Sequence, residues 1–224
     1  MSKPIALQLY SMRHVEMSLD ELLGEVAAIG YAGVETIGDH GLSIDEMNAL
    51  LEKHNLRAIS THVSLDALEA DLDGIIAFNK GIGNDTITIP YLAEELRGET
   101  GEAWSAIGKR MDVLAQGCAD AGMRLLYHNH SFEMVEIEGK LAIDWLLEGS
   151  ESGNLGFEPD LAWIENGGVS GVELLGRYTG RCPRIHCKDL APKGENQDQM
   201  GLADVGHGTL DWSALLPAAK SAGG

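Results

Sequence analysis

The stretch GVETIGDHGLSIDEMNALLEKHNLRAISTHVS, residues 33–64, decides the fold class of this chain. Its two ends, GVETIG (33–38) and RAISTHVS (57–64), are rich in β-branched residues, which is typical of strands. Between them, SIDEMNALLEKHN (43–55) carries apolar residues at the spacing of one helix face. The stretch therefore predicts a strand–helix–strand unit.

The same unit recurs along the chain. Ser18 with Glu21, and Ser43 with Glu46, predict a capping box at the start of two of the helices, and Gly30 closes the first. Strands are predicted at 5–11, 33–38, 57–64, 85–92, 124–130, within 155–164 and at 182–190. Helices are predicted at 18–30, 43–55, 65–80, 99–121, 141–149, 171–180 and 210–223, with a small hairpin at 133–140 and a polar loop at 191–208.

Seven strand–helix pairs in unbroken alternation predict right-handed crossovers and a parallel sheet. Two folds meet this description, a TIM (β/α)8-type barrel and an open doubly wound sheet. The open sheet usually carries a glycine-rich turn after its first strand, whereas SMRHVEMS (11–18) has no glycine. The sequence therefore favours a single TIM-barrel domain over residues 1–224.

The eighth strand–helix unit of such a barrel is absent from the sequence, which stops at KSAGG (220–224) where that strand is expected. A barrel without one strand has open edges, which promote aggregation. We expect either that the protein continues beyond Gly224 or that a neighbouring chain of a homo-oligomer covers the gap.

Composition limits the classes of partner and compartment. The formal net charge of −19 disfavours binding to nucleic acid or anionic lipid. Three cysteines without CxxC spacing fit a reducing compartment. The start, MSKPIALQLY, lacks the apolar run of a signal peptide, and no segment is apolar over the ~18 residues of a membrane span. These features predict a cytoplasmic protein with a small-molecule ligand.

Polar side chains gather at the carboxyl ends of the predicted strands, where barrel enzymes place their active sites. They are Gln8, Tyr10, Glu35, His62, His128, Asn129, His130, Glu133, Glu158, Asp160, His186, Lys188 and Asp189. Any single histidine here is more often structural, and a single aspartate is more often a helix cap. Because the pattern repeats on three successive strands, and ionisable groups are costly to bury, we expect a functional cluster. Mixed carboxylate and imidazole donors suit Mn²⁺, Mg²⁺ or Co²⁺, with Zn²⁺ as an alternative.

Five motifs carry a resemblance to a known family. They are QLYSMR (8–13), YHNHSFE (127–133), PDLAW (159–163), HCKD (186–189) and VGHGTLDW (205–212). In this order the chain resembles the sugar phosphate isomerase/epimerase family of the xylose-isomerase-like TIM barrel superfamily. His207 departs from the GEG that is common in place of GHG in that family.

The resemblance implies a divalent metal bound by Glu133, Asp160 and His186, with His128 as an alternative ligand and a fourth ligand beyond Gly224. It implies catalytic roles for Glu133, as ligand and base, and for Lys188, which would hold a substrate oxygen or an enolate or else form a structural ion pair. The implied substrate-binding residues are Tyr10, Glu35, His62, His128, His130, Trp163 and Lys188.

The activity implied is that of a metal-dependent isomerase or epimerase, moving a proton next to a carbonyl of a sugar, keto-sugar or polyol. A lyase or dehydratase on a keto-sugar or glycoside would use the same site. Two further alternatives are a non-catalytic sugar-binding relative and an abasic-site endonuclease, and the −19 charge and 8 histidines argue against the endonuclease.

Overall fold

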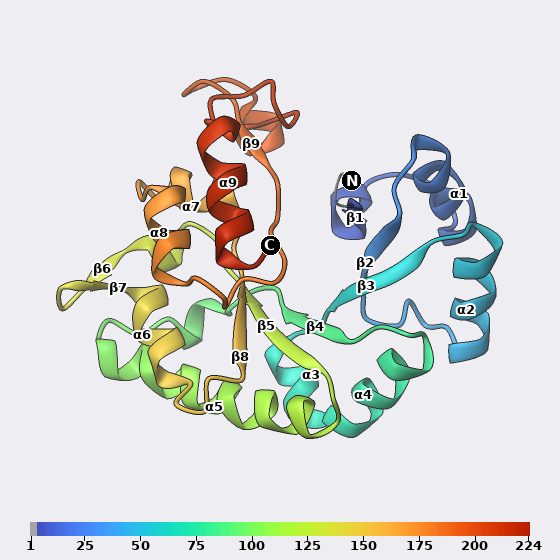
Figure 1. Cartoon of the computed structure of the whole chain (residues 1–224), viewed down its shortest axis with the longest axis horizontal. Coiled ribbons are helices and arrows are strands. Elements are labelled where there is room, and N and C mark those ends of the chain that lie inside the picture. The colour runs from blue at the N-terminus through green and yellow to red at the C-terminus, as the bar shows by residue number, and fades with distance from the viewer. Residues whose placement is uncertain (1–3) are drawn as a thin grey trace. The chain divides into compact units, whose positions relative to one another are not determined.

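Strands and helices alternate along the chain in a computed structural model that describes residues 4–224 (Figure 1). The chain divides into two compact units. Unit 1 holds the described residues up to Ile89 and Gly117–Leu125, and unit 2 holds Pro90–Gln116 and Leu126–Gly224. That the chain is a single domain stays a prediction.

Unit 1 contains a parallel sheet whose strands pair in chain order. The strands are β1 (Ala6–Gln8), β2 (Gly33–Ile37), β3 (Arg57–His62) and β4 (Thr86–Ile89). The helices are α1 (Leu19–Ile29), α2 (Ile44–Lys53), α3 (Leu65–Ala70) and α4 (Leu72–Gly81). Apolar faces of α1 and α2 pack with the sheet around Leu23, Val34 and Met47, so the predicted strand–helix–strand unit is confirmed.

The boundaries in unit 1 follow local chemistry. Both predicted capping boxes form, with Ser18 and Ser43 each accepting the backbone N–H of the glutamate three residues on. The predicted strand 5–11 is shorter, because residues Leu9–Met12 form a 3-10 helix, η1. The predicted helix 65–80 is two helices, because the Asp71 side chain accepts the Gly74 N–H (3.0 Å) and starts α4 there.

Unit 2 continues the alternation. Strand β5 (Arg124–His128) begins in unit 1 and ends in unit 2, where its neighbour is β8 (Leu155–Glu158). The predicted hairpin is present as β6 (Glu136–Ile137) and β7 (Lys140–Leu141). The helices, 3-10 turns and remaining strands are η2 (Glu94–Leu96), α5 (Gly101–Asp120), η3 (Phe132–Met134), α6 (Ala142–Gly149), α7 (Leu161–Asn166), α8 (Gly171–Arg177), β9 (Asp189–Leu190), η4 (Gln197–Gln199), β10 (Leu202–Ala203) and α9 (Trp212–Ala222).

The predicted strand 182–190 is wrong as a continuous strand. Within this range a parallel bridge joins Asp160 and His186, and the short strand β9 at its end pairs antiparallel with β10. Pro183 has no N–H to donate to a ladder, which weakens strand pairing at the start of this segment. The bridge nevertheless places His186 beside the end of β8, since the His186 N–H donates to the Pro159 carbonyl (2.9 Å).

The predicted segment 155–164 is strand only as far as Glu158, and α7 begins at Leu161. Within residues 4–224, no helix is both long and apolar enough to cross a membrane.

Candidate metal centre

The two carboxylate oxygens of Asp160 have different partners. Oδ1 accepts the Trp163 N–H (3.1 Å) and so caps α7. Oδ2 lies 4.0 Å from His128 Nε2 and 4.0 Å from His186 Nδ1. The Asp160 N–H donates to Asn129 Oδ1 (2.9 Å), which ties the end of β8 to the residue after β5. The helix cap thus fixes the carboxylate so that its second oxygen faces two imidazoles.

His128, Asp160 and His186 fit a divalent cation. Each offers a donor atom within 4.8 Å of the other two, and the first two side chains are fully buried. Ligands about 2 Å from an ion lie at most about 4 Å from one another, so small side-chain shifts complete a site. Two imidazoles and one carboxylate suit Zn²⁺, Co²⁺ or Mn²⁺.

Lys188 shares Asp160 with this group. Its Nζ lies 2.5 Å from Asp160 Oδ2, the oxygen that faces the two histidines. The ammonium also lies 5.7 Å from the centre of the Trp163 ring, and its side chain is 29% exposed. A buried carboxylate needs a counter-charge, and here Lys188 supplies it.

Glu158 points to the same side of the chain as Asp160. Its Oε2 lies 3.5 Å from His186 Nε2, and its side chain is buried. Residues two apart on a strand share a face, which accounts for this placement.

Glu133 lies in a separate hydrogen-bonded pair. It accepts the Tyr127 hydroxyl on Oε1 (2.6 Å) and the His130 N–H on Oε2 (2.8 Å). Burial, opposed by these hydrogen bonds, raises the pKa of Glu133 to about 7. Among residues 4–224, Glu133 is in no group of three or more metal donors. Tyr127 and His128 alternate across β5, so the turn η3 brings Glu133 to Tyr127.

His130 lies in a group of aromatic rings. Its ring stacks on Phe132 and Trp163, with centroids 5.8 and 6.0 Å away, and lies perpendicular to the Tyr91 ring, with centroids 5.2 Å apart. The Arg97 guanidinium lies over Phe132 at 3.5 Å and over Tyr91 at 4.7 Å. Sequence reasoning missed Tyr91 and Arg97, although a tyrosine at the carboxyl end of the predicted strand 85–92 could have indicated the first.

The other predicted substrate-binding residues belong to unit 1. His62 lies between Gln8 and Glu35, with Nδ1 2.9 Å from Gln8 Nε2 and Nε2 3.0 Å from Glu35 Oε2. Tyr10 is 55% exposed on η1. The structure thus brings Glu35 and His62 together, while Tyr10 faces solvent.

Asp189 organises the loop before α9. One oxygen accepts the N–H groups of Leu190 and Leu210, and the other accepts those of Gly206 and Gly208 and the Trp212 indole N–H. Its side chain is fully buried, and these five bonds account for it as a structural residue.

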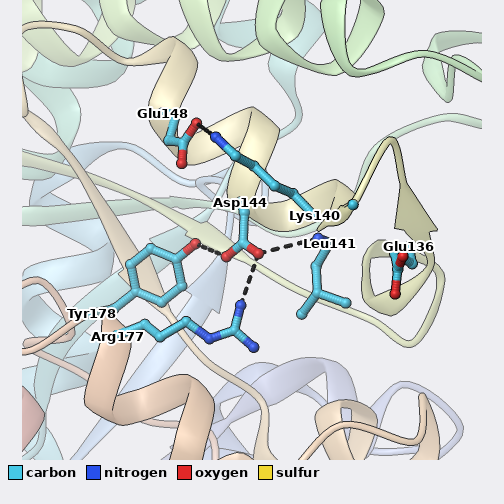
Figure 2. Close-up of a pocket in the computed structure, with 8 residues that line it drawn as sticks. Glu136, Lys140, Leu141, Asp144, Glu148, Arg177 and Tyr178 are labelled. Carbon is cyan, nitrogen blue, oxygen red and sulfur yellow. Dashed lines mark hydrogen bonds and ion pairs between the residues drawn. The ribbon is translucent and has the colours of Figure 1, made fainter.

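A cavity of about 460 Å³ opens beside the hairpin β6–β7 (Figure 2). Arg177 and Tyr178 converge on Asp144 there, and the Leu141 N–H donates to the same carboxylate. Lys140 reaches Glu148 at 2.6 Å. The sequence offered no signal for this cavity, because its residues come from a hairpin and two helices.

Comparison with known proteins identifies the family. The family model for the xylose isomerase-like TIM barrel matches residues 23–223. The chain belongs to this family. An inosose dehydratase of Geobacillus kaustophilus is 32% identical over 192 residues, which cover 76% of this chain and 62% of that protein. The chain spans less than two thirds of the length of the curated relatives it matches.

Solved structures share the fold. A sugar phosphate isomerase/epimerase from Parabacteroides distasonis aligns with a TM-score of 0.80 at 18% identity, over 99% of this chain and 88% of that one. An IolI protein with a bound zinc atom aligns with a TM-score of 0.76 at 16% identity, over 99% and 86%. The prediction of a TIM-barrel-type α/β fold is confirmed.

Proposed function

We propose that this chain is part of a cytoplasmic, divalent-metal-dependent enzyme that moves a proton next to a carbonyl of a sugar, keto-sugar or polyol. The observation that carries the proposal is the convergence of His128, Asp160 and His186 beside Lys188. Membership of a family with enzymes named as isomerases, epimerases and dehydratases supports it.

The proposed ligands are His128, Asp160 and His186. The resemblance implied Glu133 as a ligand, with His128 as the alternative. Both oxygens of Glu133 already accept hydrogen bonds, and among residues 4–224 its carboxylate belongs to no cluster of metal-donor atoms. A divalent ion bound here would act as a Lewis acid toward a carbonyl and the adjacent hydroxyl.

The remaining polar groups hold or move protons. Glu158 is the proposed proton acceptor, because its buried Oε2 lies 3.5 Å from Nε2 of the proposed ligand His186. Glu133 is the second candidate, since its pKa of about 7 lets it hold and release a proton near neutral pH, although it lies in the separate pair with Tyr127. The Lys188 ammonium would hold the substrate oxygen on which negative charge develops.

The aromatic group would bind the apolar face of the substrate ring. Tyr91 is 45% exposed, and its ring lies perpendicular to that of His130. Trp163 stacks on the same imidazole. Ring faces of this kind pack against C–H groups, while His130 offers a polar edge to hydroxyls.

A dehydratase is the second candidate, favoured by the curated relatives that are named inosose dehydratase. After removal of the same proton, the enzyme would expel a β-hydroxyl group. This reaction needs an acid for the leaving hydroxyl, for which Lys188 and His130, both beside Trp163, are the candidates.

The test is a panel of 2-keto and 3-keto sugars and cyclic polyhydroxy ketones, followed by NMR in D₂O with Mn²⁺, Co²⁺ or Zn²⁺ added. Deuterium incorporation with an intact skeleton supports isomerisation or epimerisation, and loss of a hydroxyl supports dehydration. Glu133→Gln and Glu158→Gln identify the proton acceptor, with the exposed Glu102→Gln as the matched control. Full metal loading without exchange on any substrate would favour a non-catalytic sugar-binding protein.

A further inference from the structure

One oxygen atom, Asp160 Oδ2, faces three groups that cannot all use it in the same way. Lys188 Nζ lies 2.5 Å from it, and His128 Nε2 and His186 Nδ1 each lie 4.0 Å from it. The first contact is an ion pair, and the other two outline the proposed metal site. The inference below rests on that proposed site.

Without a metal, Lys188 provides the charge that Asp160 needs. Asp160 has no exposed surface, and a buried carboxylate without a cation is strongly unfavourable. The nearby imidazole nitrogens of His128 and His186 lie 4.0 Å from Asp160 Oδ2, beyond hydrogen-bond distance, so the ammonium at 2.5 Å is the closer partner. The ion pair therefore stabilises the metal-free protein.

With a metal, the ammonium is in the wrong place. A divalent ion on Asp160 Oδ2 would occupy the oxygen lone pairs that now accept from Lys188. The ion would also supply the positive charge that Lys188 now supplies to this carboxylate. The Lys188 ammonium and a divalent ion would also repel each other if both contacted Asp160 Oδ2, because little water screens the two charges there. Lys188 therefore weakens metal binding while it stays on Asp160.

The ammonium has a second place within reach of its flexible stem. The face of Trp163 lies 5.7 Å from Lys188 Nζ, and a cation is attracted to an indole ring at this range. Trp163 also stacks on His130 in the wall to which we assign the substrate. Movement from Asp160 to Trp163 would bring the ammonium to that wall.

We propose that Lys188 is an internal counterion that pairs with Asp160 in the metal-free protein and is displaced by the bound metal, which frees its ammonium for a substrate oxygen. The structural ion pair and the substrate contact are then two states of one side chain. Metal loading would thereby also prepare the cation that receives the substrate.

The first test compares metal affinity. Co²⁺ and Zn²⁺ are titrated by calorimetry into the whole chain as wild type, Lys188→Met and Lys188→Gln, with circular dichroism to verify folding. Removal of the competing ammonium is expected to tighten binding at least tenfold. Lys140→Met is the matched control, because Lys140 pairs with Glu148 at 2.6 Å outside the site, and its affinity should equal that of wild type. Unchanged or weaker binding in both Lys188 variants overturns the proposal.

The second test uses wild-type protein and does not depend on a variant that folds. Acetylation of lysine amines is followed by mass spectrometry with and without Co²⁺. Displacement predicts that Lys188 reacts at least threefold faster with metal, while Lys140 reacts at the same rate. Equal or slower labelling of Lys188 in the metal-loaded protein contradicts the displacement. If neither wild type nor the Lys188 variants bind any metal, the proposed function itself fails, together with this inference.

Discussion

The hydroxyl of Tyr127 donates a 2.6 Å hydrogen bond to Oε1 of Glu133, and neither side chain has exposed surface. Burial raises the pKa of Glu133 to about 7 from its ordinary value of 4.5, despite this hydrogen bond and the one from the His130 N–H. Burial also raises the pKa of Tyr127, and the charge of Glu133 adds to the effect. This pair lies on the opposite side of β5 from His128, so the two sides of the strand have separate chemistry.

Glu133 predicts a pH dependence of stability. Since its pKa is raised on folding, its contribution is most favourable below about pH 4.5 and is lost as the pH rises through about 7. The loss amounts to as much as about 3 kcal/mol. Urea unfolding should give a lower free energy of unfolding at pH 8 than at pH 5 in wild type. The difference should be absent in Glu133→Gln, which keeps a carbonyl acceptor. A Glu102→Gln control should behave as wild type, and an equal pH dependence in Glu133→Gln would show that another group is responsible.

Metal affinity should depend on the two histidines. We expect His128→Ala and His186→Ala each to weaken Zn²⁺ or Co²⁺ binding at least tenfold, because each removes one of three donors. Calorimetric titration and metal analysis of the dialysed protein provide the measurement. The exposed His207→Ala is the control, and a comparable loss in that variant would mean that binding occurs elsewhere.

Asp189 should be a major determinant of stability. We expect Asp189→Ala to lower the free energy of unfolding by about 2–4 kcal/mol, because five N–H donors lose a buried acceptor. Thermal or urea unfolding measures this, with Asp198→Asn in the exposed part of the same loop as the control. A loss below about 0.5 kcal/mol would indicate that water replaces the carboxylate.

The same aspartate predicts acid sensitivity. Burial alone would raise the pKa of Asp189, but the hydrogen bonds from Trp212, Leu210, Gly206 and Leu190 together lower it below 3.8. Its stabilising contribution is therefore complete above about pH 4 and is lost as the pH falls through the lowered pKa. Between pH 5 and pH 2, the free energy of unfolding should fall more steeply with decreasing pH in wild type than in Asp189→Asn. Identical slopes in the two proteins would refute this.

Helices α5 and α6 approach closely through glycines. A Cβ on Gly108 would overlap the Leu146 carbonyl oxygen, and one on Gly149 would overlap that of Ser105. We expect Gly108→Ala to destabilise the protein by about 1–3 kcal/mol, although alanine favours a helix. Gly176→Ala in α8 is the control, because nothing lies within 4 Å of its added Cβ, and it should stabilise by up to about 1 kcal/mol. Equal effects of the two substitutions in urea unfolding would exclude the packing explanation.

The alternation of strands and helices was predictable from residues 33–64 outward, because apolar spacing and capping boxes are local properties of the chain. The membership of Asp160 and His186 in one polar cluster was also predictable, since ends of neighbouring parallel strands lie at one edge. Asp160 can be both a helix cap and a metal ligand, because Oδ1 caps α7 and Oδ2 faces His128.

Only the tertiary structure decided how the side chains of YHNHSFE divide. The turn after β5 directs Glu133 to Tyr127, while His128 faces Asp160, and periodicity cannot predict the path of a turn. The placement of Tyr91 and Arg97 against His130 and Phe132 likewise depends on segments distant in the chain. The sequence determined which elements form, because their signals are local, and the packing decided which polar groups meet, because those contacts are not.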